Sequence, residues 1–553
     1  MSDPLEVTPI HDLAVIGAGI NGLGIAQDAA LRGLDVVLVE QDDVCSGVSA
    51  WSGRLVHGGL RYLEQYDFGL VRESLLERER LFRLAPHLVR PVPLMMPLYR
   101  HNRRPPWMVR LGMIVYDLLS FRKTPPWHRI LSRRETLERF PGLAPDGLTG
   151  AALFYDGQVE LAERLCVELA LDARQAGADI RTHMRADGPL TGMPAGFWCT
   201  NTLTGEREQM RARVVLNVAG PWIDRVVHAD GIPDQPRLNG GTKGSHLVVD
   251  PFPGAPRDVV YYESRRDGRL VLVIPWMGRY LIGTTDIRFE DDPADARCDI
   301  GEAEYLLEEV NQLIPQANLG LGEVLFTYSG VRPLPYKPDA AESSVPRSHV
   351  LFDHDADGLP GWVTVVGGKL TTYRQLAEDA VDLVFRRLNR EAPPCPTRER
   401  RLPGFRDGEP SDVSVQLVET TGMSRFTASR LTRLYGSRAG EVWRLTEADM
   451  ELGDVLDPGS GLIGAEVVFA LQNELAVTLT DVLARRVLVA FEPDHGLGSL
   501  DRVSTVAARC AGWSEERRQQ EMAGYRSWLN HLAIPDASGP RSVSFGADPL
   551  SAD

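Results

Sequence analysis

The chain has 553 residues, which is too long for one simple hydrophobic core, so we expect two or three domains. Its composition, with 43% hydrophobic and 25% charged residues, is ordinary for a globular protein. The net charge of −16 argues against a general nucleic-acid binder, which needs a basic face. It does not exclude a local basic pocket that binds a small anion.

The six cysteines lie far apart, with no C-x-x-C pair and no clustering with histidines. This spacing favours a reducing compartment and argues against a disulfide scaffold or a metal site. The N-terminal residues lack the regions of a signal peptide, and no run of about 18 uncharged apolar residues occurs. We therefore expect a cytoplasmic protein, either free or bound to a membrane surface through an amphipathic patch.

A strand, a glycine-rich turn and a helix follow one another near the N-terminus. The apolar run Asp12–Ile16 passes directly into GAGING and then into the helix-like LGIAQDAALRG. In a dinucleotide fingerprint the first glycine permits the tight turn, the second lets the backbone approach a pyrophosphate, and the third lets helix and strand pack closely. These roles fall on Gly17, Gly19 and Gly22.

A second strand, Asp35–Val39, ends on Glu40, which lies 18 residues past Gly22. An acid there can accept hydrogen bonds from a ribose diol, and it disfavours NADP, whose ribose carries a phosphate. The helix N-terminus offers N–H groups and a partial positive charge to the phosphates. The pattern predicts FAD or NAD without separating them, and a glycine-rich turn in another kind of α/β protein is the alternative.

The middle of the chain alternates between helical and strand patterns. Leu70–Leu84 reads as an amphipathic helix, and residues 91–150, rich in Pro, Arg and Trp, read as an inserted, irregular segment. Helical spacing returns over residues 158–176. Arg213–Val218 is a buried strand whose end would lie near the nucleotide in a doubly wound fold.

A strand-rich region follows, and residues 362–374 repeat the strand–glycine–helix order of the N-terminus, with a helix continuing over residues 375–388. Beyond about residue 400 the pattern changes, and strand signals become few. Helical spacing there predicts a separate all-helical module built on residues 426–435, 464–491 and 514–532.

One stretch near the N-terminus, Trp51–Glu64, reads WSGRLVHGGLRYLE. It sets two arginines, a histidine and a pair of glycines among leucines. Taken alone, the stretch fits either a solvated amphipathic turn or the wall of a site that binds an anion. The remainder of the chain separates these two readings.

Seven stretches together resemble the FAD-dependent glycerol-3-phosphate dehydrogenases, within a wider superfamily of glycine-oxidase-like flavoproteins. In chain order they are GAGINGLGIAQDAALRGLDVVLVE, HGGLRYLE, NVAGPW, KGSHLVV, VIPWMGRYLIGTTD, TYSGVRPL and GGKLTTYR. The resemblance extends from about residue 12 to about residue 530, because EVVFALQNELAVTLTDVLARR is similar to the helical module of this family. A single glycine fingerprint is weak support, but seven motifs in family order are specific.

The resemblance implies an α/β flavoprotein with an added α domain. A doubly wound FAD-binding domain is expected from residues 10–90, 151–228 and 340–390. A mainly antiparallel substrate-binding domain is expected from residues 91–150 and 229–339. A helical C-terminal domain, for which dimerisation is the usual role, is expected over residues 400–535, followed by a disordered tail over 536–553.

The reaction implied is oxidation of sn-glycerol 3-phosphate to dihydroxyacetone phosphate, by hydride transfer from C2 to flavin N5, with the electrons passed to a quinone. A phosphate dianion favours a bidentate guanidinium and further cationic donors. For any one cation, a position on a solvated face is the alternative. The family motifs assign substrate binding to Arg61, Tyr62, Arg332 and Lys369, and they place Thr284 of the GTTD turn near the pocket. For GTTD, a simple β-turn without a role in binding is an equal alternative.

His246, in KGSHLVV, matches a histidine that lies near the reacting carbon in the family. A neutral imidazole can accept the proton of the C2 hydroxyl, since its unperturbed pKa is about 6.5. His57 is a second candidate for this base, and Arg332 is a candidate for stabilising a developing alkoxide. A structural histidine at the start of a strand is the alternative for His246, and the sequence leaves the base open.

The expected FAD contacts come from the fingerprint, the strand ends and the last glycine loop. Backbone N–H groups of that loop would suit the N1/C2=O side of the isoalloxazine, where negative charge accumulates on reduction. The predicted cofactor-binding residues are Gly17, Gly19, Asn21, Gly22, Glu40, Ser49, Ser52, Ala219, Gly220, Gly367, Gly368 and Lys369.

The segment before HGG departs from the family, which usually has a Ser/Thr-rich run ending in Ser-Lys. Here Ser46–Arg54 reads SGVSAWSGR, although Ser49 and Ser52 remain. Hydroxyls common in relatives are replaced by other side chains, and some flavin or phosphate contacts are therefore expected to differ.

Arg103–Lys123 combines basic residues, Trp107 and an apolar core. These features suit docking on the inner face of the cytoplasmic membrane, where bacterial relatives sit, and an ordinary buried helix is an equal alternative. The resemblance also implies a homodimer, and no nucleic-acid partner is expected. An oxidase that passes electrons to O2, and a flavin-binding sensor or scaffold without turnover, are the alternative functions.

Overall fold

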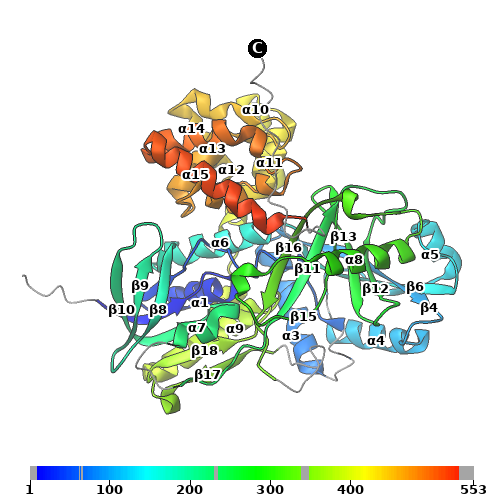
Figure 1. Ribbon diagram of the computed structural model, residues 1–553, viewed down its shortest axis with the longest axis horizontal. Coiled ribbons are helices and arrows are strands. Elements are labelled where there is room, and N and C mark those ends of the chain that lie inside the picture. The colour runs from blue at the N-terminus through cyan, green and yellow to red at the C-terminus, as the bar shows by residue number, and fades with distance from the viewer. Residues whose placement is uncertain are drawn as a thin grey trace, which may run out of the picture.

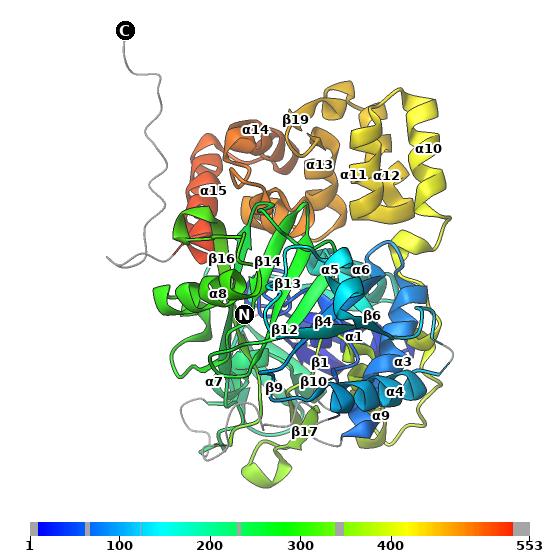
Figure 2. The same ribbon diagram turned by 90° about the vertical axis from the view of Figure 1, so that its right-hand side faces the viewer.

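The computed structural model describes residues 9–60, 63, 67–121, 123–228, 234–337 and 348–534. In these residues the chain forms two large sheets and a helical C-terminal part, which Figures 1 and 2 show in two orientations. The arrangement confirms the predicted fold class. The predicted tail over residues 536–553 lies outside the described residues, and the domain limits stay a prediction.

The first sheet has the parallel centre of a doubly wound fold. Its strand order is β17-β18-β10-β1-β2-β7, in which every neighbouring pair is parallel except β17 with β18. A hairpin of β8 and β9 extends β10 on one side. The strands are β1 (Ile10–Ile16), β2 (Val36–Val39), β7 (Asp179–Arg181), β8 (Met184–Leu190), β9 (Ala195–Asn201), β10 (Arg207–Asn217), β17 (Val350–Asp353) and β18 (Trp362–Val366).

Three helices pack together against this sheet. The helix α1 (Ile20–Leu31) follows directly from β1 and lies between α6 (Ala162–Gln175) and α9 (Tyr373–Arg387). A Cβ atom on Gly24 would stand 2.7 Å from Cδ2 of Tyr373, so a glycine is what lets α1 and α9 approach this closely. The close packing fixes the N-terminus of α1 at the end of β1, where the fingerprint expects the phosphates.

The second sheet is antiparallel apart from one contact between β4 and β12. Its central path runs β15-β11-β14-β13-β12-β4-β6-β3, with β16 beside β11 and β5 beside β6. The strands are β3 (Leu55–Val56), β4 (Val89–Tyr99), β5 (Arg129–Ser132), β6 (Leu148–Val159), β11 (Thr242–Val249), β12 (Val259–Glu263), β13 (Leu270–Trp276), β14 (Arg279–Gly283), β15 (Ile287–Arg288) and β16 (Val324–Arg332).

Helices cover this sheet and join it to the first one. Leu306, Leu307 and Val310 share a buried core with Leu247 and Val249 of β11. The helices of this part are α3 (Phe68–Leu84), α4 (Pro106–Leu119), α5 (Arg133–Arg139) and α8 (Ile300–Leu313), whereas the short α7 (Ile223–Val227) packs on β8 and β18 of the first sheet.

The prediction of an irregular segment over residues 91–150 was wrong, because this stretch contains β4, α4, β5, α5 and the start of β6. Pro91, Pro93 and Pro97 lie within β4, which pairs fully with β6 on one side. On its other side β4 meets β12 only at Leu94 and Met95, so the missing N–H groups of the prolines break no ladder there.

The helical C-terminal part stands over α6 and over the ends of the second sheet (Figure 1). It shares one hydrophobic core with the helices of the first sheet, a core to which Leu483 and Phe491 contribute together with Leu165 and Leu169 of α6. A π-helical segment, Asp481–Arg486, replaces part of the continuous helix expected over residues 464–491. The helices of the C-terminal part are α10 (Pro410–Thr421), α11 (Arg425–Tyr435), α12 (Ala439–Arg444), α13 (Gly464–Asn473), α14 (Leu500–Ala511) and α15 (Glu515–Trp528).

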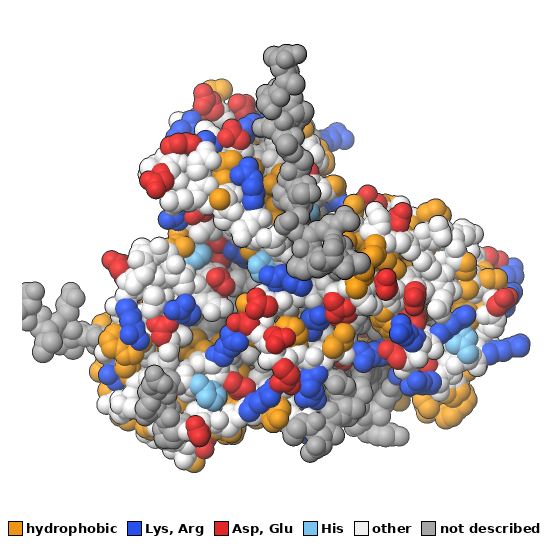
Figure 3. Space-filling view, viewed as in Figure 1, with side chains coloured by type: hydrophobic (Ala, Val, Ile, Leu, Met, Phe, Trp, Pro, Cys, Tyr) orange, Lys and Arg blue, Asp and Glu red, His pale blue; other side chains and the backbone are white. Residues whose placement is uncertain are grey.

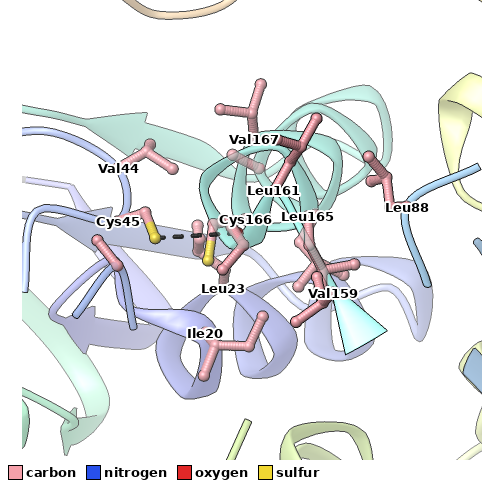
Figure 4. Close-up of a cluster of buried hydrophobic side chains, with 14 of the residues drawn as sticks. Ile20, Leu23, Val44, Cys45, Leu88, Val159, Leu161, Leu165, Cys166 and Val167 are labelled. Carbon is pink, nitrogen blue, oxygen red and sulfur yellow. Dashed lines mark hydrogen bonds between the residues drawn. The ribbon is translucent and has the colours of Figure 1, made fainter. Parts of the chain in front are cut away.

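All six cysteines are free. Cys45 and Cys166 lie side by side in the core where the loop after β2 meets α6, among apolar residues such as Leu23 and Leu165 (Figure 4). Burial raises the pKa of the Cys45 thiol, so this thiol stays protonated and packs as a small apolar group.

Candidate active site

The turn between β1 and α1 is as tight as its glycines predict. Gly17 has φ +111°, and a Cβ there would stand 2.7 Å from the carbonyl oxygen of Val218. A Cβ on Gly22 would stand only 1.9 Å from the carbonyl oxygen of Gly17. A larger residue at Gly22 would therefore push α1 away from β1, and one at Gly17 would collide with the chain at the end of β10.

Glu40 stands at the end of β2 beside this turn. Its carboxylate accepts hydrogen bonds from the backbone N–H groups of Ala18, at 2.7 Å, and Asp42, at 3.1 Å. Burial, and next the neighbouring carboxylate of Asp42, raise the pKa of Glu40 to about 7. The acid expected to bind a ribose is thus buried, oriented and close to half ionised at neutral pH.

An open cleft of about 770 Å³, partly continuous with solvent, runs between the fingerprint turn, the end of β2 and the end of β10. Its size suits a large cofactor. The predicted cofactor-binding residues that line it are Gly17, Gly19, Asn21, Glu40, Ser49, Ala219 and Gly220. Trp222, at the strand end expected near the nucleotide, also lines it, and so do residues that the sequence did not single out: Gln41, Met184, Arg185, Ala186 and Pro333.

A buried acceptor faces the second glycine loop. Asn21 Oδ1 is buried and has no hydrogen-bond partner among the described residues. A Cβ on Gly368 would stand 2.5 Å from Asn21 Nδ2, so the amide lies directly against this loop. Gly367 and Gly368 have φ +81° and +90°, which glycine tolerates best. The loop needs its glycines, and the amide oxygen points to a missing donor.

Ser49 and Ser52 are both held by local contacts. Ser49 Oγ accepts a hydrogen bond from the N–H of Ile20 at 3.0 Å, at the first turn of α1. Ser52 Oγ accepts one from the N–H of Arg54 at 3.4 Å, and its carbonyl accepts one from the hydroxyl of Tyr328 at 3.0 Å. Ser49 lines the cleft, whereas Ser52 ties the altered segment to β16.

These residues fit FAD. The glycine turn leaves room for a diphosphate beside the start of α1, Glu40 suits a ribose diol, and the orphan amide of Asn21 lies beside the Gly367–Gly368 loop.

His246 lies on β11, near one end of the second sheet, opposite Gly283 of β14 and Tyr328 of β16. Its ring lies 5.0 Å from the ring of Tyr328, and its Nδ1 is buried without a hydrogen-bond partner among the described residues. Burial, and then the positive charges of Arg332 and Arg54, lower the pKa of His246 to about 3. The imidazole is therefore neutral at any physiological pH.

Arg332 and Thr284 are brought together although 48 residues separate them. One guanidinium nitrogen of Arg332 donates to Thr284 Oγ1 at 3.0 Å, and the other donates to Asp286 Oδ1 at 3.0 Å. A Cβ on Gly244 would stand 2.1 Å from this guanidinium, so the glycine of KGSH makes room for the arginine. The motifs KGSH, GTTD and VRPL thus converge on one group.

The HGG and GGKLTT motifs also meet. The backbone N–H of His57 donates to Thr371 Oγ1 at 3.2 Å, and the N–H of Gly58 donates to the hydroxyl of Tyr116 at 3.0 Å. Lys369 Nζ donates to Ser74 Oγ of α3 at 3.1 Å. Arg61 and Tyr62, predicted to bind substrate, lie outside the described residues.

Arg54, which stands where the family usually has lysine, is fully buried. It forms a bidentate ion pair with Glu163, at 2.6 and 2.8 Å. The guanidinium carbon lies within 6 Å of the ring centres of Trp276 and Tyr328, an arrangement typical of cation–π contacts. Because Arg54 also acts on the pKa of His246, it is a residue of the site that the sequence did not single out.

The fold and the site define a flavin-dependent oxidoreductase. The family model described as "FAD dependent oxidoreductase" matches residues 12–374, and the one described as "C-terminal domain of alpha-glycerophosphate oxidase" matches residues 395–518. The cofactor is FAD, and the chain is an enzyme of this class.

The particular family follows from sequence relatives. The chain is 43% identical over 539 residues to a glycerol-3-phosphate dehydrogenase of Synechocystis, covering 95% of this chain and 97% of the relative. It is 37% identical to one of Pseudomonas aeruginosa, covering 86% of this chain and 91% of that relative. The chain belongs to the family of FAD-dependent glycerol-3-phosphate dehydrogenases.

Solved structures agree. A glycerol-3-phosphate dehydrogenase from Bacillus halodurans, complexed with FAD, superposes with a TM-score of 0.78 at 27% identity and covers 95% of both chains. An α-glycerophosphate oxidase from Mycoplasma pneumoniae with FAD bound shares the fold, with a TM-score of 0.54 at 18% identity, over 71% of this chain and 99% of the oxidase. Among the described residues of the present chain, no helix has the length and apolar character to cross a membrane.

Proposed function

We propose that this protein oxidises sn-glycerol 3-phosphate to dihydroxyacetone phosphate and passes the electrons to a quinone. Family membership supports the substrate, and the observation that carries the chemistry is His246. A buried, neutral imidazole with an unpartnered nitrogen stands on the sheet that also presents Arg332. When bound, FAD supplies the hydride acceptor for this reaction.

His246 is proposed to take the proton of the C2 hydroxyl. Its nitrogen Nδ1 has no competing partner among the described residues, and its neutral form can accept a proton. The pKa of about 3 reflects burial first and the charge of Arg332 second. A phosphate dianion beside Arg332 would offset the second cause, so substrate binding would raise the basicity of His246 as it is needed.

Arg332, Thr284 and Lys369 are proposed to bind the phosphate. Asp286 and Thr284 hold the guanidinium of Arg332 in one orientation, which supports a preorganised anion site. Arg61 and Tyr62 are assigned to the same pocket through the HGGLRYL motif alone. His57 is the second candidate for the base, and its backbone N–H holds the HGG segment against Thr371.

The FAD diphosphate is proposed to lie at the start of α1, beside Gly17 and Gly19, with its ribose on Glu40. Backbone N–H groups near Gly367 and Gly368 are proposed to face the N1/C2=O side of the flavin. This assignment is supported by the cleft and by the orphan oxygen of Asn21.

The helix α4 is proposed to dock on the inner face of the cytoplasmic membrane, where a quinone would be reached. Its inner face buries Val109, Met113 and Tyr116. Figure 3 shows hydrophobic side chains gathered at the lower right edge, where Figure 1 draws this helix. Its outer face exposes large apolar side chains at helical spacing, which a membrane surface would cover: Trp107, Leu111, Ile114 and Leu118.

Anaerobic mixing of the FAD-loaded protein with glycerol 3-phosphate tests the proposal, with glycerol as the control. We expect bleaching of the visible flavin band by the phosphorylated compound alone. Bleaching by glycerol as well would contradict the phosphate site, and an unchanged spectrum would contradict the dehydrogenase function. Reoxidation by a water-soluble quinone, against reoxidation by O2 with release of H2O2, then separates the dehydrogenase from an oxidase related to the Mycoplasma enzyme.

A further inference from the structure

We propose that the helical C-terminal domain completes the FAD site, with Arg485 and Arg486 as positioning residues for the loop that holds the adenosine end of the cofactor. The inference rests on the FAD binding assigned above. It gives this domain a role other than the dimerisation expected of it.

The contact is a buried clamp on one carboxylate. Arg486 donates to Asp43 through two nitrogens, at 2.7 and 2.8 Å, and Arg485 donates to Asp43 Oδ2 at 2.6 Å. The side chains of Asp43 and Arg486 are completely buried. Asp43 lies three residues past Glu40, in the loop that follows β2. Two arginines of the C-terminal domain therefore hold this loop.

The local helix geometry brings the two arginines to the same carboxylate. Asp481–Arg486 is a π-helical turn, which is wider than an α-helical turn and is common at functional sites. Arg485 and Arg486 are consecutive, yet both reach Asp43. Arg486 Nε also donates to the carbonyl oxygen of Glu474 at 2.8 Å, which fixes its guanidinium from the other side.

A second contact of the same turn holds an adjoining wall of the cleft. Asp481 accepts hydrogen bonds from Arg485, at 2.6 Å, and from the ring of His183, at 3.0 Å. The backbone N–H of His183 donates to the carbonyl oxygen of Asp42 at 2.6 Å. The next residue, Met184, donates to the carbonyl oxygen of Glu40 at 2.6 Å. The two walls are therefore tied to each other and to the C-terminal domain.

The clamped segments are the ones that line the cleft. Gln41 and Ser46 flank Asp43 on one wall, and Met184–Ala186 follow His183 on the other. Without the guanidinium groups, the charge of Asp43 would be buried and unpaired, and the loop would be driven to carry it towards solvent. A loop that opens in this way cannot keep Glu40 oriented towards a ribose.

The matched control is an ion pair that joins the two domains away from the cleft, in which Glu474 also accepts a hydrogen bond from Arg438 of its own domain at 3.1 Å. Arg164 of α6 pairs with Glu474 through two hydrogen bonds, at 2.6 and 2.8 Å, and both side chains are completely buried. It joins the same domains with the same geometry, but neither residue lines the cleft. The contact of Glu474 with Arg486 uses the main-chain oxygen, so Glu474→Gln keeps it.

The test is titration of full-length apoprotein with FAD, and separately with ADP, which carries the adenosine end alone. The variants are Asp43→Asn and the milder Arg485→Lys, with Glu474→Gln as control. We expect Asp43→Asn to raise the Kd of both ligands about ten- to hundredfold, with a smaller rise for Arg485→Lys. Glu474→Gln should lower the unfolding temperature and leave both Kd values within about twofold of wild type.

Unchanged Kd values in Asp43→Asn and Arg485→Lys, with unfolding temperatures lowered as in the control, would overturn the proposal. A rise confined to FAD, with ADP binding unchanged, would also overturn it, because the clamp acts on the adenosine end. If Asp43→Asn does not fold, the Arg485→Lys titration decides. If the wild-type protein does not turn over glycerol 3-phosphate, the proposed function is refuted. The FAD and ADP affinities of the variants then still decide whether the clamp holds the cofactor site.

Discussion

The backbone N–H of His57 donates a hydrogen bond to Thr371 Oγ1, at 3.2 Å, across 314 residues of sequence. This contact joins the segment that leads to Arg61 with the loop that carries Lys369. The contact therefore ties together two motifs that lie far apart in the sequence and that are both assigned to the proposed phosphate site. This hydroxyl is one contact that holds the two motifs together.

We expect Thr371→Val to lower kcat/KM for glycerol 3-phosphate about five- to thirtyfold, mainly through KM. Valine keeps the shape but leaves the N–H of His57 without its acceptor, and a lost buried hydrogen bond costs about 1–2 kcal/mol. Steady-state rates measure the effect, with the neighbouring buried threonine variant Thr372→Val as control. Equal rates for both variants would show that the contact between His57 and Thr371 does not support the substrate site.

We expect His246→Asn to slow flavin reduction by glycerol 3-phosphate about 10²- to 10⁴-fold, because a proton acceptor at the reacting carbon is lost. Substrate affinity should change little. Anaerobic stopped-flow measurement at several substrate concentrations separates the two quantities. A rate within fivefold of wild type would show that another residue is the base. The rate of flavin reduction in His57→Asn should then be measured.

Much of the nucleotide end of the molecule could be predicted from sequence because its constraints are local. The glycine at position 22 is required by a contact inside one strand–turn–helix unit, with the carbonyl oxygen of Gly17, whereas Gly17 also faces the carbonyl oxygen of Val218 at the end of β10. Arg332 and Thr284 were found only through the family motifs, since their contact spans two strands and a turn. Their assignment to the substrate stays a prediction.

Other parts of the site depend on tertiary contacts that leave no local pattern. Met184–Ala186 line the cleft because β8 folds back beside β2, and nothing in their composition marks them. Arg486 reaches Asp43 across 443 residues. The prolines of β4 misled the reading of residues 91–150, because tolerance of proline depends on which edge of the strand is paired.

FAD affinity should depend on pH through Glu40. The pKa of Glu40 is raised to about 7 without ligand, and the ionised form is the better acceptor for a ribose diol. Protonation therefore opposes binding, so the Kd of the wild-type protein for FAD should rise about tenfold from pH 8 to pH 6. In Glu40→Gln this pH dependence should be absent. Fluorescence titration of apoprotein across this range measures it; equal pH dependence in both proteins would contradict the role of Glu40.

The raised pKa of Glu40 affects the stability of the apoprotein in the opposite direction: FAD affinity should rise with pH, whereas the contribution of Glu40 to stability should fall. A carboxyl whose folded-state pKa lies above its usual 4.5 contributes stability that is fully present below pH 4.5 and is lost as the pH rises through about 7. Glu40→Gln should therefore make the apoprotein relatively more stable than wild type above pH 7. Thermal unfolding of both apoproteins at pH 6 and pH 8 provides the comparison.

We expect Gly244→Ala to weaken glycerol 3-phosphate binding at least tenfold while every side chain of the site is kept. A methyl group there would stand 2.1 Å from the guanidinium of Arg332 and 2.6 Å from Thr284 Oγ1, so the arginine must turn away. Gly440→Ala, where no atom lies within 4 Å of the added carbon, is the control. KM values and FAD content measured together distinguish a displaced arginine from lost cofactor.

We expect the outer face of α4 to bind phosphatidylglycerol-containing vesicles. Trp107 is 65% exposed and Leu118 is 59% exposed, and covering a leucine side chain contributes about 1.5–3 kcal/mol. Leu111→Ser with Leu118→Ser should therefore reduce co-flotation more than tenfold, while Tyr116 keeps its contact with Gly58 and turnover with a water-soluble quinone persists. Val415→Ser, an exposed apolar residue on α10, is the control. If wild type and the double variant bind equally, or neither binds, the exposed face of α4 does not dock on lipid.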